Sequence, residues 1–249
     1  MKNVKTLMGL VLCLALWLSA TPASSKPPAK DLFVKNPNYS DTAVPAKDQK
    51  LNLKSSHKRV DQAFGKLNEE IAGFCAENRN VFRVMPKKSA LKVTSFKNWN
   101  IPVVGTFKNF AGYITWNRET GKPLAKLVVD NTSWDSGVAD RDNRVRRFLL
   151  QSHKRKNAIS VLTLEHRMQK GLDLAAGHLT LRGQDYVIGA PMKKERQGPN
   201  WLVHSTAPFR LKANIPERDM FRIMKLCNHQ SLTPAVDLEF WLVFKPACP

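Results

Sequence analysis

The stretch VDLEFWLVFK, residues 236–245, alternates between apolar and polar side chains along most of its length. Every second position carries a large apolar side chain: Val236, Leu238, Phe240, Leu242 and Phe244. The positions between them include Asp237 and Glu239, and Lys245 follows Phe244. Successive side chains of a β-strand point to opposite faces, so the pattern predicts a strand with one buried face and one wet face. Such strands are typical of antiparallel sheets.

The same period of two recurs in the rest of the chain from Val81 onward. Nine segments suit strands: VFRVM (81–85), ALKVTSFK (90–97), GTFKNFAGYITW (105–116), LAKLVVDN (124–131), AISVLTLEHRM (158–168), AAGHLTLRG (175–183), DYVIGAPM (185–192), NWLVHSTAPFRLKANI (200–215) and VDLEFWLVFK. About eight such strands close most economically into an all-β antiparallel barrel, because closure removes exposed strand edges. Asp140–Gln151 is predicted to be the one short helix that interrupts this run. A barrel of this size is either packed solid or holds one small ligand.

The chain before the barrel divides into three segments. Residues 1–23 have the features of a signal peptide, since Lys2 and Lys5 precede an apolar run that small residues follow. Residues 24–59, rich in Lys, Pro, Asn and Ser, are predicted to be a flexible basic tail. Residues 60–78 are predicted to be an amphipathic helix, with apolar residues at helical spacing: Val60, Phe64, Leu67, Ile71 and Phe74. The barrel domain then spans residues 79–249.

The charge of the chain is strongly positive. Forty Lys and Arg residues face twenty Asp and Glu residues, a formal net charge of +20. Removal of residues 1–23 leaves 38 basic residues against 20 acidic ones, or +18. Such a balance favours anionic surroundings. We expect the partner surface to be an anionic membrane rather than nucleic acid.

Three cysteines remain after the predicted signal peptide: Cys75, Cys227 and Cys248. An odd number allows at most one internal disulfide, which an exported protein can form. The first and last strands of a closed meander barrel pair with each other. Cys75 lies just before the first predicted strand and Cys248 just after the last one. We therefore predict a Cys75–Cys248 disulfide, with three free thiols as the alternative.

The polar residues offer little catalytic chemistry. Asp135, Asp140 and Asp142 are candidates for acid–base catalysis, but their surroundings favour turn and helix-cap roles. Arg141 and Arg144 are expected to pair with these acids or to meet the head group of a bound lipid. The six histidines are scattered, and no nucleophile elbow or glycine-rich phosphate loop is present. We therefore expect no enzymatic activity, no metal site and no catalytic cofactor.

Four segments, in order, resemble the YceI-like family of exported lipid-binding proteins. They are Ser89 with the strand after it, GTFKNFAGYI (105–114), VDNTSWDSG (129–137) with Asp140-Arg-Asp and Phe148-Leu, and GHLTLRG (177–183). The resemblance covers about Asn80 to Pro246. It implies an extended, lipocalin-like β-barrel with a hydrophobic interior that binds a polyisoprenoid-type amphiphile. The chain departs from the family pattern at His153–Lys156, a basic run.

The resulting hypothesis is a periplasmic protein that carries or stores an amphiphilic lipid, such as a polyisoprenoid, a quinone or a fatty-acid-like molecule. The predicted interior residues are Phe107, Phe110, Leu127, Val129, Leu162, Leu164, His166, Leu211, Leu238, Phe240 and Leu242. The alternative is a basic module that binds a polyanion or the envelope surface without a lipid ligand. An oligomer, if one forms, is expected to be a dimer.

Overall fold

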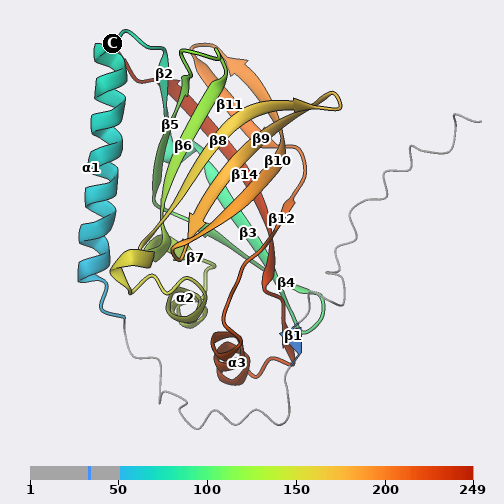
Figure 1. The fold of residues 1–249 in the computed structure, drawn as a ribbon. Helices are drawn as coiled ribbons and strands as arrows, with labels where there is room; N and C mark the ends of the chain where they lie inside the picture. Colours follow the sequence, from blue (N-terminus) through green and yellow to red (C-terminus); the bar gives the residue numbers. More distant parts are fainter. Residues whose placement is uncertain (1–32, 35–50, 249) are drawn as a thin grey trace, which may run out of the picture.

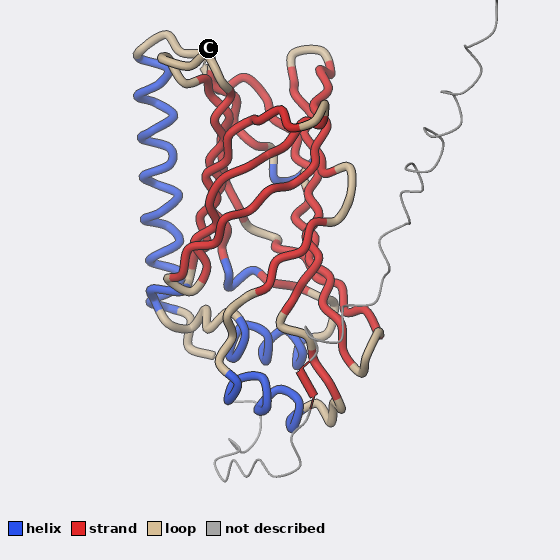
Figure 2. The backbone as a smooth tube through the Cα atoms, turned by 45° about the vertical axis from the view of Figure 1, so that its right-hand side comes forward, coloured by secondary structure: helices blue, strands red, loops and turns tan. Residues whose placement is uncertain are grey.

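The fold is a closed antiparallel β-barrel with one long helix along its side and two short helices at one end (Figures 1 and 2). The computed structural model describes residues 33–34 and 51–248. The predicted signal peptide, residues 1–23, and most of the predicted tail lie outside the described residues. Among the described helices, none has the length and apolar character needed to cross a membrane.

Eight strands form the closed wall, as the sequence predicts. They are β2 (Val81–Val84), β5 (Phe110–Trp116), β6 (Pro123–Asp130), β8 (Ile159–Gln169), β9 (Leu172–Leu181), β10 (Gln184–Gln197), β11 (Asn200–Ser205) and β14 (Ala235–Pro246). Each strand pairs antiparallel with its neighbours, and β14 pairs with β2 to close the barrel. Phe244 lies opposite both Val84 and Trp201 in these two ladders.

Strand β14 also organises a second group of strands at the end of the barrel near α2 and α3. Its first half pairs with β12 (Phe209–Lys212) and β3 (Ala90–Lys97). The remaining strands continue from β3: β4 (Ile101–Phe107), β7 (Trp134–Asp135), β13 (Ser231–Leu232) and β1 (Phe33–Val34). Residues 236–245, whose alternation predicts a strand, therefore belong to β14, the strand that joins the two groups.

Two predicted strands are each divided in the structure. The segment 105–116 turns at Lys108 and Asn109, whose backbone N–H groups donate to the carbonyl and hydroxyl oxygens of Ser133. The segment 200–215 breaks after Ser205, before Pro208, which has no N–H for a ladder. Alternation continues across the second break but changes phase at the first, where Phe110 follows Phe107 by three residues rather than two.

Helix α1 (Lys54–Ala76) packs against the outside of β2, β5, β6 and β8. It begins six residues before the predicted start at residue 60, so the end of the predicted flexible tail is helical. The physical reason is a tertiary contact, because buried Ser56 donates its hydroxyl to the Ser152 carbonyl at 2.7 Å. Leu67 and Ile71 bury the apolar face against the barrel.

The β run contains the predicted short helix and, contrary to the expectation of only one, a second helix. The predicted helix 140–151 forms as α2 (Ala139–Arg144), which continues into a π-helical turn, η4 (Val145–Leu149). A further helix, α3 (Glu217–Leu226), packs Met220, Ile223 and Met224 against Phe148 of η4. Three 3₁₀ turns complete the described elements: η2 (Pro86–Lys88), η3 (Asn131–Ser133) and η5 (Arg155–Asn157).

A disulfide joins Cys75, near the end of α1, to Cys248, just after β14, with an S–S distance of 2.10 Å. The pairing confirms the prediction, because β14 and β2 close the barrel and bring the two segments together. Cys227, beside α3, is the free cysteine of the described residues.

Candidate functional site

The barrel encloses a cavity of about 500 Å³. Its wall consists almost entirely of apolar side chains from the inward-facing positions of the strands. On β8, for example, every second residue lines it: Ser160, Leu162, Leu164 and His166. A largely apolar cavity of this size is typical of sites for small molecules. The alternation in the sequence is therefore what builds the wall.

Ten of the eleven predicted interior residues line the cavity. They are Phe107, Leu127, Val129, Leu162, Leu164, His166, Leu211, Leu238, Phe240 and Leu242. Phe110 is not part of the lining, because it is buried in a packed layer with Val84, Leu127 and Phe244. The binding of a ligand by these residues stays a prediction.

The sequence prediction missed several parts of the lining. Val145, Leu149 and Leu150 come from η4 and the residue after it, which close the cavity at the end near α2 and α3. Strand alternation carries no information about them. Ile188 and Ala190 on β10 follow the same alternation as the predicted set and could have been included.

Charged or titratable side chains line the cavity at three places: Lys92 with Glu239, Arg182, and Glu165 with His166 and Lys194. Lys92 Nζ lies 2.6 Å from Glu239 Oε2, and the two residues are partners in the β3–β14 ladder. Lys92, Glu239 and Glu165 each alternate with inward-facing neighbours, so their charged groups belong to the outer face of the wall.

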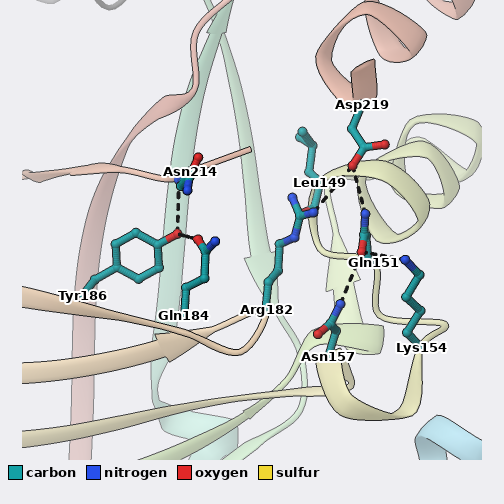
Figure 3. Close-up of polar contacts among 9 residues, drawn as sticks. All are labelled: Leu149, Gln151, Lys154, Asn157, Arg182, Gln184, Tyr186, Asn214 and Asp219. Carbon is teal, nitrogen blue, oxygen red and sulfur yellow. Dashed lines mark hydrogen bonds and ion pairs between the residues drawn. The ribbon is translucent and has the colours of Figure 1, made fainter. Parts of the chain in front are cut away.

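Arg182 lies at the end of the cavity near η4 and α3 (Figure 3). Its guanidinium donates to the Leu149 carbonyl at 3.2 Å and lies 3.5 Å from Asp219 of α3. The Gln151 amide donates to the same carboxylate at 2.9 Å. Arg182 and Gly183 form the two-residue turn between β9 and β10 with φ angles of 56° and 71°, as tight hairpins require. This network closes that end of the barrel.

His166, Asp173 and Lys194 gather at the opposite end, which we call the outer end. His166 Nε2 contacts Asp173 Oδ1, and Lys194 Nζ lies 4.0 Å from the same oxygen. The hydrogen bond with His166 is the main cause that lowers the pKa of the Asp173 carboxyl. Asp173 is therefore ionised at neutral pH. Its carboxylate lies between the His166 imidazole and the Lys194 ammonium at the outer end.

Arg141 and Arg144, the predicted head-group contacts, are not among the lining residues. Arg141 donates to the hydroxyl and carbonyl of Ser136, both at 2.7 Å, and Arg144 donates to Cys227 Sγ at 3.3 Å. Asp142 accepts from the Ser136 N–H at 2.9 Å. These contacts brace the loop before α2.

Asp135 of this loop is also engaged locally. Asp135 accepts from the Gly137 N–H at 2.8 Å and lies 3.3 Å from Lys108. The Gly137 hydrogen bond, followed by Lys108, lowers the pKa of Asp135. A general acid at neutral pH needs the opposite shift. Within the described residues, no group of three or more His, Cys, Asp or Glu side chains is placed to hold a metal ion.

The chain matches a known family over most of the barrel. The family model of the YceI-like domain matches residues 82–244. A polyisoprenoid binding domain from Saccharophagus degradans, implicated in plant cell wall breakdown, is similar with a TM-score of 0.55 and 18% identity, over 66% of this chain and 98% of that chain. At this identity the likeness shows the fold alone.

Two further solved structures resemble the chain. BcnA of Burkholderia cenocepacia has a TM-score of 0.48 and 19% identity, over 64% of this chain and 98% of its own. The YCEI protein of Campylobacter jejuni has a TM-score of 0.38 and 13% identity, over 55% of this chain and 83% of its own. A search of curated proteins gives no match.

Proposed function

Because the chain belongs to the YceI-like family, we propose that it binds an amphiphilic lipid of the polyisoprenoid or quinone type inside the barrel, as carrier or store. The observation that carries the proposal is the apolar cavity of about 500 Å³. Apolar burial contributes about 25 cal/mol per Å². A chain of several isoprene units buries on the order of hundreds of Å², which offsets the cost of ordering it. The polyisoprenoid binding domain from S. degradans, which shares the fold, supports this class of ligand.

The same proposal includes export to the periplasm and a binding rather than catalytic role. Export is supported by the signal-like pattern of residues 1–23 and by the Cys75–Cys248 disulfide, since disulfides persist in oxidising compartments. The binding role is supported by the local engagement of Asp135 and Asp142. Fractionation of cells followed by N-terminal sequencing tests export, and a chain that starts at Met1 in the cytoplasm would contradict it.

Native mass spectrometry of protein purified without detergent tests lipid binding. The wild type should retain about one lipid molecule per protein chain. Organic solvent should extract this lipid. Ala190→Phe fills the cavity from the wall, because Ala190 lines it and is 2% exposed. Val187→Phe is the matched control on the outer face of the same strand, where Val187 is 83% exposed. Ala190→Phe should lose the lipid while Val187→Phe keeps it. No lipid in the wild type and no uptake of added prenyl alcohol would overturn the proposal.

A second candidate function, binding to an anionic surface, has its own observation. The exposed basic residues at the start of α1 meet the basic run before β8: Lys54, Lys58, Lys154, Arg155 and Lys156. Two hydrogen bonds hold the segments together, from Ser56 to Ser152 at 2.7 Å and from Arg155 to Gln62 at 3.2 Å. In the part of the chain that the structure describes, no ion pair joins any of these five to an acid.

Clustered cations of this kind attract anionic lipids or polyanions, and salt screens the attraction. Co-sedimentation with phosphatidylglycerol vesicles at low and high salt tests this function, with phosphatidylcholine vesicles as the neutral comparison. Lys154→Glu with Lys156→Glu should release the protein from anionic vesicles. Lys122→Glu with Lys193→Glu makes the same charge change outside the cluster and should bind more tightly than the first variant. Equal binding by both variants would contradict a role for the cluster.

A further inference from the structure

The outer end of the cavity differs from the rest of the wall in its chemistry. Strand alternation places polar side chains there at positions that face inward. His166 follows Leu162 and Leu164 on β8, and Lys194 follows Ala190 and Met192 on β10. Asp173 precedes Ala175 and Leu179 on β9 in the same alternation. Three neighbouring strands therefore each change from apolar to polar on the inward face.

We propose that His166, Asp173 and Lys194 form a head-group subsite, and that the subsite takes an uncharged head with an oxygen acceptor, a hydroxyl or a carbonyl. The proposal rests on the proposed function, since it assigns the polar end of a ligand whose tail occupies the apolar cavity.

The contacts support a donor-rich subsite that is partly open to water. The Lys194 ammonium carries three N–H donors and lies as far as 4.0 Å from Asp173, which leaves it able to bond a ligand oxygen. The side chains of Lys194 and Asp173 are 40% and 32% exposed, and that of His166 is 17% exposed. A head group bound here would lie at the boundary between cavity and solvent, as an amphiphile requires.

The balance of charge at the outer end selects against an anionic head. Lys194 faces the Asp173 carboxylate, whereas Glu165 and Arg167 alternate with the inward-facing Leu164 and His166 and lie on the exposed outer face of β8. One inward-facing carboxylate thus matches one inward-facing cation, so a phosphate would approach without an excess of positive charge to receive it. Its own negative charge would also be repelled by the Asp173 carboxylate.

The other polar places on the wall do not offer an equivalent subsite. Arg182 is 10% exposed, and its guanidinium is engaged by Leu149 and Asp219 beneath α3. Lys92 and Glu239 face outward and pair directly at 2.6 Å. The outer end is therefore the place where inward-facing N–H donors, the apolar wall and solvent meet.

Paired probes with one tail and two heads test the proposal: geranylgeraniol and geranylgeranyl monophosphate. Their dissociation constants are measured on the full chain by displacement of a fluorescent apolar probe. The wild type should bind the alcohol about tenfold more tightly than the monophosphate, because like charges repel at short range. Asp173→Asn removes one carboxylate. It should reduce the ratio of the monophosphate dissociation constant to the alcohol dissociation constant by about fivefold or more. Lys194→Met should weaken binding of the alcohol by about fivefold, the value of roughly one hydrogen bond.

Lys193→Met is the matched control. Lys193 is the neighbour of Lys194 on β10, is 65% exposed and lies 3.4 Å from Glu195. It should change the alcohol-to-phosphate ratio less than twofold, and circular dichroism checks that each variant is folded. Tighter binding of the monophosphate by the wild type, or a ratio unmoved by Asp173→Asn, overturns the head-group assignment while lipid binding stands. Failure of both probes to bind the wild type overturns the proposed function and the subsite together.

Discussion

The guanidinium of Arg182 lies 3.5 Å from the carboxylate of Asp219, and the two side chains are only 10% and 5% exposed (Figure 3). Arg182 belongs to the turn between β9 and β10, whereas Asp219 belongs to α3. The Gln151 amide also donates to this carboxylate. The pair therefore ties a helix to the barrel wall at the end opposite His166, and it encloses the cavity on that side.

Arg182→Met should lower the free energy of unfolding by about 3 kcal/mol, because it leaves the buried Asp219 charge without its cation. Urea unfolding at pH 7 measures the loss. Arg118→Met is the matched control, since Arg118 lies 3.2 Å from Glu77 and the two side chains are 63% and 51% exposed. A pair this open to solvent should contribute less than about 1 kcal/mol. Equal losses in the two variants would show that Asp219 is not isolated from water.

The Cys75–Cys248 disulfide should contribute strongly to stability, because it closes a loop with a sequence separation of 173 residues. The chain-entropy model gives about 5 kcal/mol for a loop of this length. Cys75→Ser should lower the free energy of unfolding by an amount approaching this value, and dithiothreitol should do the same to the wild type. Cys227→Ser, which removes the free cysteine, is the control and should leave the effect of the reductant intact. A wild type indifferent to reductant would contradict the estimate.

The barrel wall could be predicted because one physical rule governs it. Each wall strand separates core from solvent, so its side chains alternate, and the alternation by itself indicates which of them line the cavity. Leu162, Leu164 and His166 follow from this rule. The Cys75–Cys248 pairing follows from closure. Helix α3 was missed although its signals are present: Pro216 before it, acidic Glu217 and Asp219 in its first turn, and Met220, Ile223 and Met224 at helical spacing.

The outer end could be predicted only in part, because strand lengths are set by pairing rather than by the pattern. The predicted strands 175–183 and 185–192 exclude Asp173 and Lys194. In the structure β9 begins at Leu172, opposite Gln169 of β8, and β10 continues to Gln197, opposite Asn200 of β11. The backbone ladder extends each hairpin past its apolar residues. The polar inward positions exist only because of that extension.

Stability should fall as the pH is lowered from about 7.5 to 5, with His153 as one cause. Burial, then Lys154 and Arg147, lowers the pKa of His153, so the folded protein favours its neutral imidazole. The unfolded chain binds the proton first, near the ordinary pKa of about 6.5. The stability that His153 contributes is therefore complete above that pH and is lost as the pH falls through the folded pKa.

His153→Gln should flatten this dependence, measured as the change in urea midpoint between pH 7.5 and 5. Burial, then Lys97 and Arg144, also lowers the pKa of His229, so the double variant with His229→Gln should flatten it further. If the urea midpoint falls equally between pH 7.5 and 5 in the wild type and both variants, the pH dependence belongs to other groups.

Gly105 should not tolerate a side chain, because the Trp134 ring lies directly over it. A Cβ at Gly105 would come within 2.2 Å of Trp134 Cζ2. The ring is 5% exposed and packs edge-on against Phe107 at a centroid distance of 5.3 Å, so it has little room to shift. Gly105→Ala should therefore cost about 1–3 kcal/mol through overpacking. Thermal and urea unfolding measure the change.

Gly189→Ala is the matched control for this prediction, since a Cβ there meets no atom within 4 Å. Alanine restricts the unfolded chain more than glycine does, so this variant should be as stable as the wild type or slightly more stable. Trp134 and Phe107 both line the cavity, so displacement of the ring by Gly105→Ala should also weaken binding of geranylgeraniol, which Gly189→Ala should leave unchanged. A stable Gly105→Ala variant with unaltered affinity would show that the Trp134 ring moves freely, and that this part of the wall is not fixed by packing.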